Sequence, residues 1–237
     1  MDAVDASLKL AAKGSEHKLT ILSAPSRHGK TFISQLLVQR FSGVALNALT
    51  DWKTSRRAML EDVAKRLGLT VKKSARSYEI SRQIREAFKT PKLLIFTELG
   101  KHTVGPAFIV WIRELLNESR AVVILCAVPE LLEELASAMK DELEQVENRG
   151  RLIRSHPIGP DAVQWFFARS RHGNIPTEAA QALATGANQY GGFTLLRSAA
   201  ALKTPPADAE AASEIVRSYR HTRHIEPRRA QRGHRIG

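Results

Sequence analysis

The sequence predicts an α/β protein: a five-stranded parallel sheet covered by helices, followed by a small all-helical domain. Short apolar runs alternate with helical patterns over the first two thirds of the chain, which is typical of a parallel sheet with helices on both faces. The alternation ends near Pro157, and only helical patterns follow Pro160. We therefore expect an α/β core over residues 1–156, a helical lid domain over 157–224 and a flexible basic tail over 225–237.

Five short apolar runs have the length and composition of buried strands. They cover residues 19–22, 44–46, 93–96, 122–125 and 152–153. Helical patterns lie between and after these runs, at residues 31–40, 54–67, 78–89, 106–118, 129–146, 161–171, 177–190, 193–202 and 207–220. The first of these helices is expected to carry four apolar side chains on one side: Phe32, Ile33, Leu36 and Leu37.

Composition limits the classes of function that need to be considered. The 237 residues include 36 Lys and Arg against 24 Asp and Glu, a net charge of +12, which favours a polyanionic partner such as nucleic acid or an acidic membrane surface. The single cysteine, Cys126, excludes an internal disulfide and a multi-cysteine metal site. The start of the chain does not resemble a signal peptide, and the longest apolar stretch, 121–128, is too short to cross a bilayer. We expect a soluble, cytosolic protein.

A phosphate-binding loop is the strongest chemical signal in the sequence. The segment lies between a predicted strand and a predicted helix and consists of Ala24, Pro25, Ser26, Arg27, His28, Gly29, Lys30 and Thr31. The backbone N–H groups of such a loop surround phosphates, its lysine reaches the β- and γ-phosphates, and its threonine hydroxyl ligates Mg²⁺. Gly29 allows the backbone to approach the phosphate closely. The alternative interpretation is an ordinary strand–turn–helix junction, and Ala24 stands where the motif usually has its first glycine.

The strand at residues 93–96 continues into Thr97 and Glu98, where a nucleotide-hydrolysing enzyme places its acidic residues. Glu98 has the position of the carboxylate that polarises the attacking water. Thr97 replaces the aspartate that supports the metal ion, and its hydroxyl supplies no charge. The sequence therefore predicts ATP and Mg²⁺ as ligands, with weakened Mg²⁺ affinity and slow hydrolysis. The alternative is that Glu98 only begins a solvated loop.

The order of these motifs resembles the AAA+ ATPases of DNA transposition, the Mu B, TniB and TnsC-like group. The resemblance covers residues 8–219 and rests on the phosphate loop, the strand 93–98, the segments 128–131 and 148–151, and the helical domain that follows. It implies ATP binding between neighbouring subunits and assembly as a ring or helical filament on duplex DNA, without strong sequence specificity. It also implies recruitment of a transposase in the bacterial cytoplasm, and disassembly upon hydrolysis.

The same resemblance implies roles for individual residues. Arg149 or Arg151 would be the arginine finger inserted into a neighbouring subunit's site, the other interpretation being a solvated helix end. Arg197 would face the phosphates from the helical domain, unless it is a surface charge. Phe32, directly after the loop, and Thr97 would complete the nucleotide-binding segment. Cys126 has the place of a polar sensing residue but is better explained as a small buried side chain.

Three basic segments are candidate DNA contacts. They are the C-terminal tail with Arg228, Arg229 and Arg232, the segment with Lys72, Lys73 and Arg76, and the pair Lys101 and His102. Residues 217–237 alone contain seven Arg and one Glu, a composition suited to salt-sensitive attraction to a phosphate backbone. The two internal segments have positions that line the central channel in many AAA+ assemblies. Incidental solubility of the tail and ordinary solvated loops are the alternatives.

Two other functions are compatible with the same motifs. One is an ATP-dependent scaffold or adaptor in which Thr97 has largely removed hydrolysis. The other is a related AAA+ ATPase of secretion or signalling with no role on DNA. A small-molecule kinase is disfavoured, because the helical domain follows the core instead of interrupting it as a substrate lid.

Overall fold

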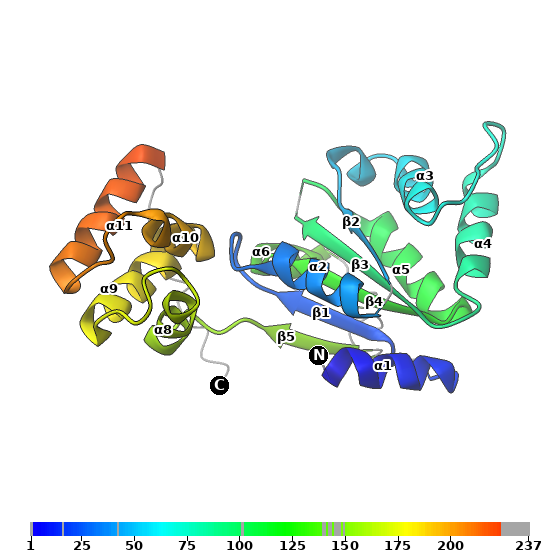
Figure 1. Cartoon of the computed structure of the whole chain (residues 1–237). Coiled ribbons are helices and arrows are strands. Elements are labelled where there is room, and N and C mark those ends of the chain that lie inside the picture. The colour runs from blue at the N-terminus through cyan, green and yellow to red at the C-terminus, as the bar shows by residue number, and fades with distance from the viewer. Residues whose placement is uncertain are drawn as a thin grey trace. The chain divides into compact units, whose positions relative to one another are not determined.

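The chain forms two compact units, which we describe separately (Figure 1). The computed structural model describes residues 2–15, 17–41, 43–100, 102–138, 141, 144, 148 and 150–223. The first unit comprises Met1–Pro25 and Lys30–Ser155, and the second comprises Ser26–Gly29 and His156–Gly237. The sequence analysis expected a domain boundary after residue 156, and the long segment of the second unit begins at His156. The sequence did not predict that Ser26–Gly29 would group with the helical part.

The first unit is built on a five-stranded parallel sheet, as the sequence predicted. The strands are β1 (Leu19–Ser23), β2 (Val44–Asn47), β3 (Lys92–Leu99), β4 (Ala121–Ala127) and β5 (Gly150–Arg154). They are arranged in the order β2-β3-β4-β1-β5, and all neighbouring pairs are parallel. Because parallel strands end at the same edge of the sheet, the loops after β1, β2, β3 and β4 all leave from one side.

Helices cover both faces of this sheet (Figure 1). The helices α1 (Asp2–Ala12) and α2 (Lys30–Phe41) pack on one face. The opposite face is covered by the short η1 (Thr50–Lys53), α3 (Arg56–Arg66), α4 (Ser77–Ala87), α5 (Pro106–Glu118) and α6 (Pro129–Ala138). The sequence did not predict α1. Most of residues 139–146, the second half of the predicted helix 129–146, lie outside the described residues. Of the described helices, none is long and apolar enough to span a membrane.

The central strand β3 divides the core into two layers. Leu93 and Ile95 belong to the cluster that includes α1 and α2, whereas Leu94 and Phe96 belong to the cluster that includes α3, α4 and α5. Successive side chains of a strand point to opposite faces, so a strand that is covered on both faces must be apolar throughout. This requirement explains the uninterrupted apolar run from Leu93 to Phe96.

An aromatic cluster fixes the end of β3. The ring of Phe96 contacts Trp52 and Phe108 edge to face, with centroid separations of 6.0 and 5.3 Å. Trp111 makes a third edge contact at 6.0 Å, and all four rings are almost completely buried. Edge-to-face pairs are favoured by the charge distribution of aromatic rings. The cluster therefore positions the two residues that follow Phe96.

The expected apolar side of α2 does not face the core. Of the four side chains placed on that side, only Leu37 is buried, and Phe32 is 64% exposed. Lys30, Ser34 and Leu37 face inward instead, at the spacing i, i+4 and i+7. The rotation of α2 follows from Lys30, its first residue, because that side chain is buried inside the preceding loop. Ile33 and Leu36 are consequently exposed together with Phe32.

The second unit is a small helical bundle, in agreement with the predicted helical patterns. Its helices are α8 (Pro160–Ala168), α9 (Thr177–Gly186), α10 (Phe193–Ala201) and α11 (Ala209–Arg223). Their core is formed mainly by Ala and Leu side chains, and all four helices contribute to it. The predicted helix 177–190 is interrupted, because Ala187–Gly191 form a π-helical turn. Within this turn the Asn188 side-chain amide pairs with both backbone groups of Ile158, at 2.8 and 2.9 Å.

Candidate functional site

The predicted phosphate loop connects β1 to α2 and has the backbone of an anion-binding turn. At its start, Ala24 N–H donates to the carbonyl of Ala127 at the end of β4, at 3.1 Å. Arg27 and Gly29 both adopt left-handed backbone conformations, with φ of 66° and 82°. Such conformations turn successive N–H groups toward one point and form a concave anion site. A Cβ at Gly29 would lie at ordinary contact distances of 3.5–3.7 Å, so the positive φ is what favours glycine there.

Lys30 places a positive charge at the inside of this loop. Its side chain is only 7% exposed, and its Nζ donates to the carbonyls of Ala24 at 2.6 Å and Pro25 at 2.9 Å. An ammonium group that is so deeply buried requires oxygen partners. The arrangement fits the role expected of this lysine, since phosphate oxygens are equally good acceptors for an ammonium.

The structure brings Thr31 and Glu98 together. The hydroxyl of Thr31, in the first turn of α2, donates to Oε1 of Glu98 at 3.2 Å. The pairing of β3 with β4 shifts register between Phe96 and Leu99, and Glu98 has a left-handed φ of 56°. Bulges of this kind redirect side chains next to active sites. Glu98 is therefore exposed between two buried neighbours and turned toward the loop.

Thr97 is buried and paired with a residue that the sequence analysis did not select. Its Oγ1 lies 2.5 Å from Oδ1 of Asn47 and 3.3 Å from the carbonyl of Leu46. Asn47 ends β2 next to Thr97 in the register. A polar residue that directly follows an apolar strand run, as Asn47 follows Leu46, is the signal that could have identified it. The Thr97–Asn47 pair places neutral oxygens where a metal-supporting carboxylate was expected.

The described residues contain no group of three or more His, Cys, Asp and Glu side chains that could hold a metal ion by themselves. Mg²⁺ commonly binds through one or two protein groups together with the phosphates of a nucleotide. Thr31, beside Glu98, fits that mode of binding, because a hydroxyl and a carboxylate oxygen lie together at the mouth of the loop.

Cys126 is a buried small side chain, as the sequence analysis favoured. It lies in β4 opposite Leu22 and is 1% exposed. Burial raises the pKa of the Cys126 thiol to about 12, while the charge of Lys30 acts in the opposite direction and that of Glu98 in the same direction. A thiol with so high a pKa stays protonated and unreactive near neutral pH.

The two candidate arginine fingers lie on or next to the edge strand β5. Arg149 lies outside the described residues. Arg151 is exposed and pairs in register with Thr20, near the start of β1 and three residues before the end that carries the phosphate loop. Three residues of a strand span about 10 Å. Arg151 is thus remote from its own subunit's loop, so the expected role in a neighbouring subunit stays a prediction.

Residues Ser26–Gly29 of the predicted phosphate loop belong to the second unit, where a backbone hydrogen bond joins them to the start of α10. Phe193 N–H donates to the carbonyl of Arg27 at 3.0 Å. A Cβ on the preceding residue, Gly192, would lie 2.5 Å from that carbonyl oxygen, and Gly192 has a positive φ of 52°. Only glycine fits both conditions. Arg197 is exposed one turn later on α10, and its predicted contact with phosphate stays a prediction.

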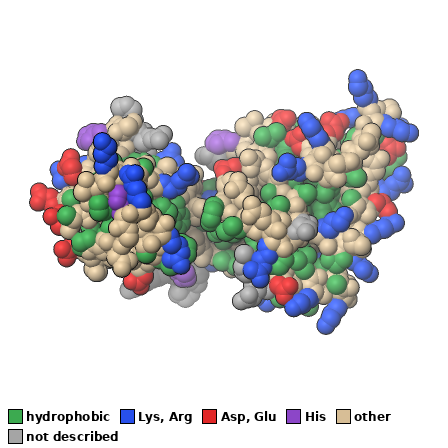
Figure 2. Space-filling view, viewed as in Figure 1, with side chains coloured by type: hydrophobic (Ala, Val, Ile, Leu, Met, Phe, Trp, Pro, Cys, Tyr) green, Lys and Arg blue, Asp and Glu red, His purple; other side chains and the backbone are tan. Residues whose placement is uncertain are grey.

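The candidate DNA contacts are exposed where the structure describes them. Lys72, Lys73 and Arg76 lie on the loop between α3 and α4, and His102 lies on the loop after β3. The other candidates, Lys101, Arg228, Arg229 and Arg232, lie outside the described residues together with the tail 225–237. Figure 2 shows Lys and Arg side chains gathered along the side of the first unit that α3 and α4 form.

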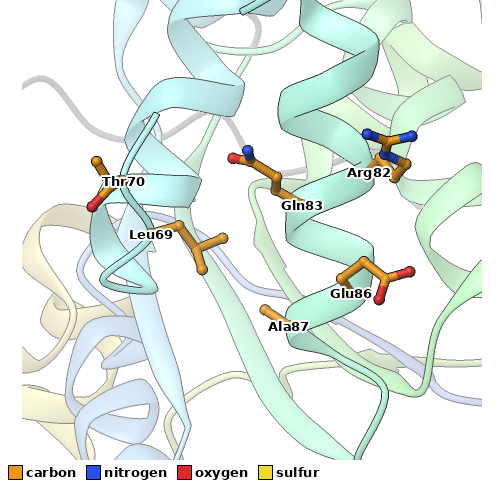
Figure 3. A pocket seen from close by; sticks show the side chains of 6 residues that line it. All are labelled: Leu69, Thr70, Arg82, Gln83, Glu86 and Ala87. Atoms are coloured by element: carbon orange, nitrogen blue, oxygen red, sulfur yellow. The ribbon is translucent and has the colours of Figure 1, made fainter. Parts of the chain in front are cut away.

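A shallow hollow of about 390 Å³ lies beside α4 and is lined by Leu69, Thr70, Arg82, Gln83, Glu86 and Ala87 (Figure 3). Leu69 and Ala87 point toward each other across it, whereas Arg82 and Glu86 point away from Leu69. The hollow is therefore lined mainly by apolar surface and has no convergent donors for a phosphate group. We assign no nucleotide to it.

Comparisons with known proteins identify the fold. The ORC2 protein of Aeropyrum pernix, in ADPNP–ADP complexes, matches with a TM-score of 0.56 and 12% identity over 90% of this chain and 66% of that one. Domain III of the replication initiation protein DnaA from Thermotoga maritima matches with a TM-score of 0.52 and 16% identity, over 92% and 91% of the two chains. The chain has an AAA+ fold.

Further comparisons define how far this similarity extends. The AAA+ fold also matches the Aeropyrum pernix ORC1 protein in complex with DNA, with a TM-score of 0.50, 12% identity and coverage of 95% of this chain and 62% of that one. The chain spans about two thirds of the length of the ORC proteins that it matches. No protein-family model matches the sequence, and no curated protein does. At these identities the likeness concerns the AAA+ fold alone.

The left-handed backbone at Glu98 predicts an unusual order of stability among substitutions. Glu98→Gly should be more stable to urea than Glu98→Ala by about 0.5–1 kcal/mol, because only alanine retains the steric cost of positive φ. At exposed Gln83 in the interior of α4, glycine and alanine substitutions should have the reverse order, by about 1 kcal/mol. Equal stabilities of the two variants at position 98 would contradict a strained backbone there.

Burial of Cys126 predicts a loss of stability at alkaline pH. The folded thiol has a pKa of about 12 against an ordinary value of 9.0, so above pH 9 the unfolded chain loses a proton that the folded chain keeps. The free energy of unfolding should then fall by up to about 1.4 kcal/mol per pH unit more than in Cys126→Ala. Urea unfolding of both proteins at pH values from about 8 to 11 measures this difference. Parallel pH profiles would contradict it.

Proposed function

We propose that this protein is an ATP-dependent AAA+ ATPase that binds duplex DNA without strong sequence preference, assembles on it and presents it to a transposase. The observation that carries the proposal is the meeting of three groups at the end of the sheet. Lys30 lies inside the phosphate loop, and Thr31 donates to Glu98 at 3.2 Å. A buried cation, a hydroxyl and a carboxylate in this order are the groups that hold and hydrolyse a nucleoside triphosphate.

Each residue of the loop has a separate task in this proposal. The backbone N–H groups around Arg27 and Gly29 hold the phosphates, and Lys30 neutralises their charge. Thr31 would hold Mg²⁺, which neutralises charge on the phosphate oxygens when it is bound. Glu98 accepts a hydrogen bond from the attacking water and orients it. Arg151 of one subunit would contribute a positive charge to the next subunit's site.

The neutral pair of Thr97 and Asn47 supports slow turnover. The single proton of the Thr97 hydroxyl is directed at Asn47, so the remaining lone pairs can accept a hydrogen bond from metal-bound water but add no negative charge. A site of this kind keeps ATP bound for a long time before hydrolysis. Long retention suits a nucleotide that acts as an assembly signal, since binding that favours the assembled state stabilises it.

The positive surface supports DNA as the polyanionic partner. Lys72, Lys73 and Arg76 are exposed on one loop, and no described residue forms an ion pair with them. Lys and Arg side chains that remain unpaired can neutralise backbone phosphates, with an affinity that falls steeply as salt rises. The similarity in fold to ORC1, whose structure is a complex with DNA, adds support for this partner.

An exposed apolar surface on α2 supports the proposed assembly of several copies of the chain. Phe32, Ile33 and Leu36 are exposed next to one another at the start of that helix. Contiguous apolar side chains on a surface commonly mark protein–protein contacts. In a ring or filament they would be covered by the adjacent subunit, close to the nucleotide that Thr31 helps to hold.

Recruitment of a transposase is the part of the proposal that rests on the motif order alone. The structures to which the chain is similar are ORC proteins and a domain of the replication initiation protein DnaA, which share with it the AAA+ fold. The second candidate function, an ATP-dependent adaptor with little hydrolysis, is favoured by Thr97 in place of an acidic residue. The rate of ATP hydrolysis separates these two functions. If the protein is an ATPase, Glu98→Gln should hydrolyse ATP much more slowly than the wild type. If it is an adaptor, the two rates should be equal.

ATP control of DNA binding is tested with Lys30→Ala. The wild-type protein should bind a random duplex at least about tenfold more tightly with ATP than with ADP, because the triphosphate favours the assembled state, and binding should weaken between about 50 and 200 mM salt. Lys30→Ala should lose the ATP effect. Lys13→Ala, which removes an equal charge from an exposed position, should keep it. Fluorescence anisotropy measures all three, and binding that is identical with ATP and ADP would contradict the proposal.

The proposal that Thr97 slows hydrolysis, because it replaces a metal-supporting aspartate, is tested by introducing that aspartate. Thr97→Asp should raise both the Mg²⁺ affinity and the rate of ATP hydrolysis by about tenfold, because a negative charge then supports the metal-bound water. The Asn47 amide can rotate to donate to the new carboxylate. Thr97→Asn, of the same shape without the charge, is the matched control and should show no gain. A steady-state ATPase assay over a Mg²⁺ titration measures both parameters, and equal rates in the two variants would exclude this explanation.

A further inference from the structure

The segment around α4 carries an unusual concentration of positive charge. Residues 65–92 contain nine Lys and Arg against two Glu. Arg85 and Lys89 are neutralised locally, by Glu118 and Glu86. The remaining cations include those of the loop between α3 and α4, which Figure 2 shows at a strongly basic side of the first unit.

The backbone of this loop is held by the guanidinium of Arg57 on α3. Its Nη1 donates to the carbonyl of Ala75 and its Nη2 to the carbonyl of Lys73, both at 2.9 Å. Its Nε donates to Glu61 one turn along the same helix, at 2.7 Å. The planar guanidinium thus binds three acceptors at once, which a lysine cannot do in the same geometry.

Other contacts close the loop around this clamp. Ala75 N–H donates to the carbonyl of Lys72 at 2.9 Å, and the Ala75 side chain is buried. Val71 packs partly against the main core. At the far end, Arg76 N–H donates to the Glu79 carboxylate at 2.6 Å and starts α4. The backbone of the loop is therefore ordered, while its charged side chains project into solvent.

An ordered loop binds a phosphate backbone more tightly than a loose one. Fixing the backbone of a loop costs conformational entropy, and a loop that is already fixed does not incur this cost when it binds. The donors of Arg57 bond to loop carbonyls, so Arg57 fixes the conformation of the loop. The exposed side chains of Lys72 and Lys73 are then available for phosphate groups.

We propose that Arg57 is a positioning residue that holds the loop 72–76 as a rigid basic edge for the phosphate backbone of DNA. The inference rests on the proposed function for its ligand. It assigns to Arg57 a role that neither the sequence motifs nor the AAA+ fold specify. The role is distinct from that of a phosphate ligand, and the two can be separated by experiment.

Digestion with endoproteinase Lys-C tests the clamp without DNA. This protease cleaves only after lysine, so Arg57→Ala leaves its sites unchanged. Cleavage after Lys72 or Lys73 should be roughly tenfold faster in Arg57→Ala than in the wild type, because two hydrogen bonds that hold the loop are lost. Arg56→Ala is the matched control, since Arg56 pairs with Glu114 instead of the loop. Thermal unfolding of each variant verifies that it is folded at the digestion temperature.

Binding of a random duplex over a salt series tests the ligand. Arg57→Ala should bind about three- to tenfold more weakly with an unchanged slope of log affinity against log salt, because the number of phosphate contacts stays the same. The double variant Lys72→Ala/Lys73→Ala should instead lower the slope by about 1.8. Arg57→Lys, which keeps the charge but not the forked donors, should resemble Arg57→Ala in both assays except for cleavage at the new lysine.

The outcomes distinguish this inference from the proposed function. Unchanged cleavage in Arg57→Ala would overturn the clamp. A slope reduced by about 0.9 in Arg57→Ala would make Arg57 a phosphate ligand and also overturn it. If the wild-type protein bound no DNA while Arg57→Ala was cleaved faster, the proposed function would fail together with the DNA ligand, and the loop-holding role would be retained. Faster cleavage with weaker binding at unchanged slope supports the whole inference.

Discussion

The candidate site depends on the packing of Phe96. Its ring is enclosed by Trp52, Phe108 and Trp111, at centroid separations of 5.3–6.0 Å. Because these rings come from helical segments on one face of the sheet, they hold the end of β3 in one position. The bulge that follows can therefore turn Glu98 toward the phosphate loop without shifting the strand. The geometry of the candidate site is a consequence of this apolar packing, although none of the four rings lies among its polar groups.

The polar groups of the site are distributed over the ends of three strands. Lys30 and Thr31 follow β1, Asn47 ends β2, and Thr97 and Glu98 lie near the end of β3. The parallel arrangement is what gathers them, since residues that are far apart in sequence meet at one edge of the sheet. Among these groups, only the lysine and the glutamate carry charge. This small number of charged groups is the basis for the slow hydrolysis that we propose.

Most secondary structure could be predicted, because its signal is local. The helix Pro106–Glu118 has its predicted limits, since Pro106 starts it and an apolar periodicity continues to its end. All five strands lie where apolar runs predicted them. The orientation of α2 could not be predicted, because apolar spacing suggested one face, whereas the buried Lys30 imposed another. The helix α1 was also missed, although Val4, Leu8 and Ala11, which pack against the sheet, have helical spacing in the sequence.

The sequence by itself determined the parallel sheet and the excess of positive charge, and it predicted the loop between β1 and α2 as a phosphate loop, since each of these depends on neighbouring residues or on composition. Tertiary structure alone decided which groups meet. It placed Thr31 against Glu98, joined Thr97 to Asn47, and brought Arg57 to the carbonyls of the basic loop. These partners are separated by between 16 and 67 positions. No local pattern encodes such pairs, because their contact depends on how strands order themselves and on how helices pack against them.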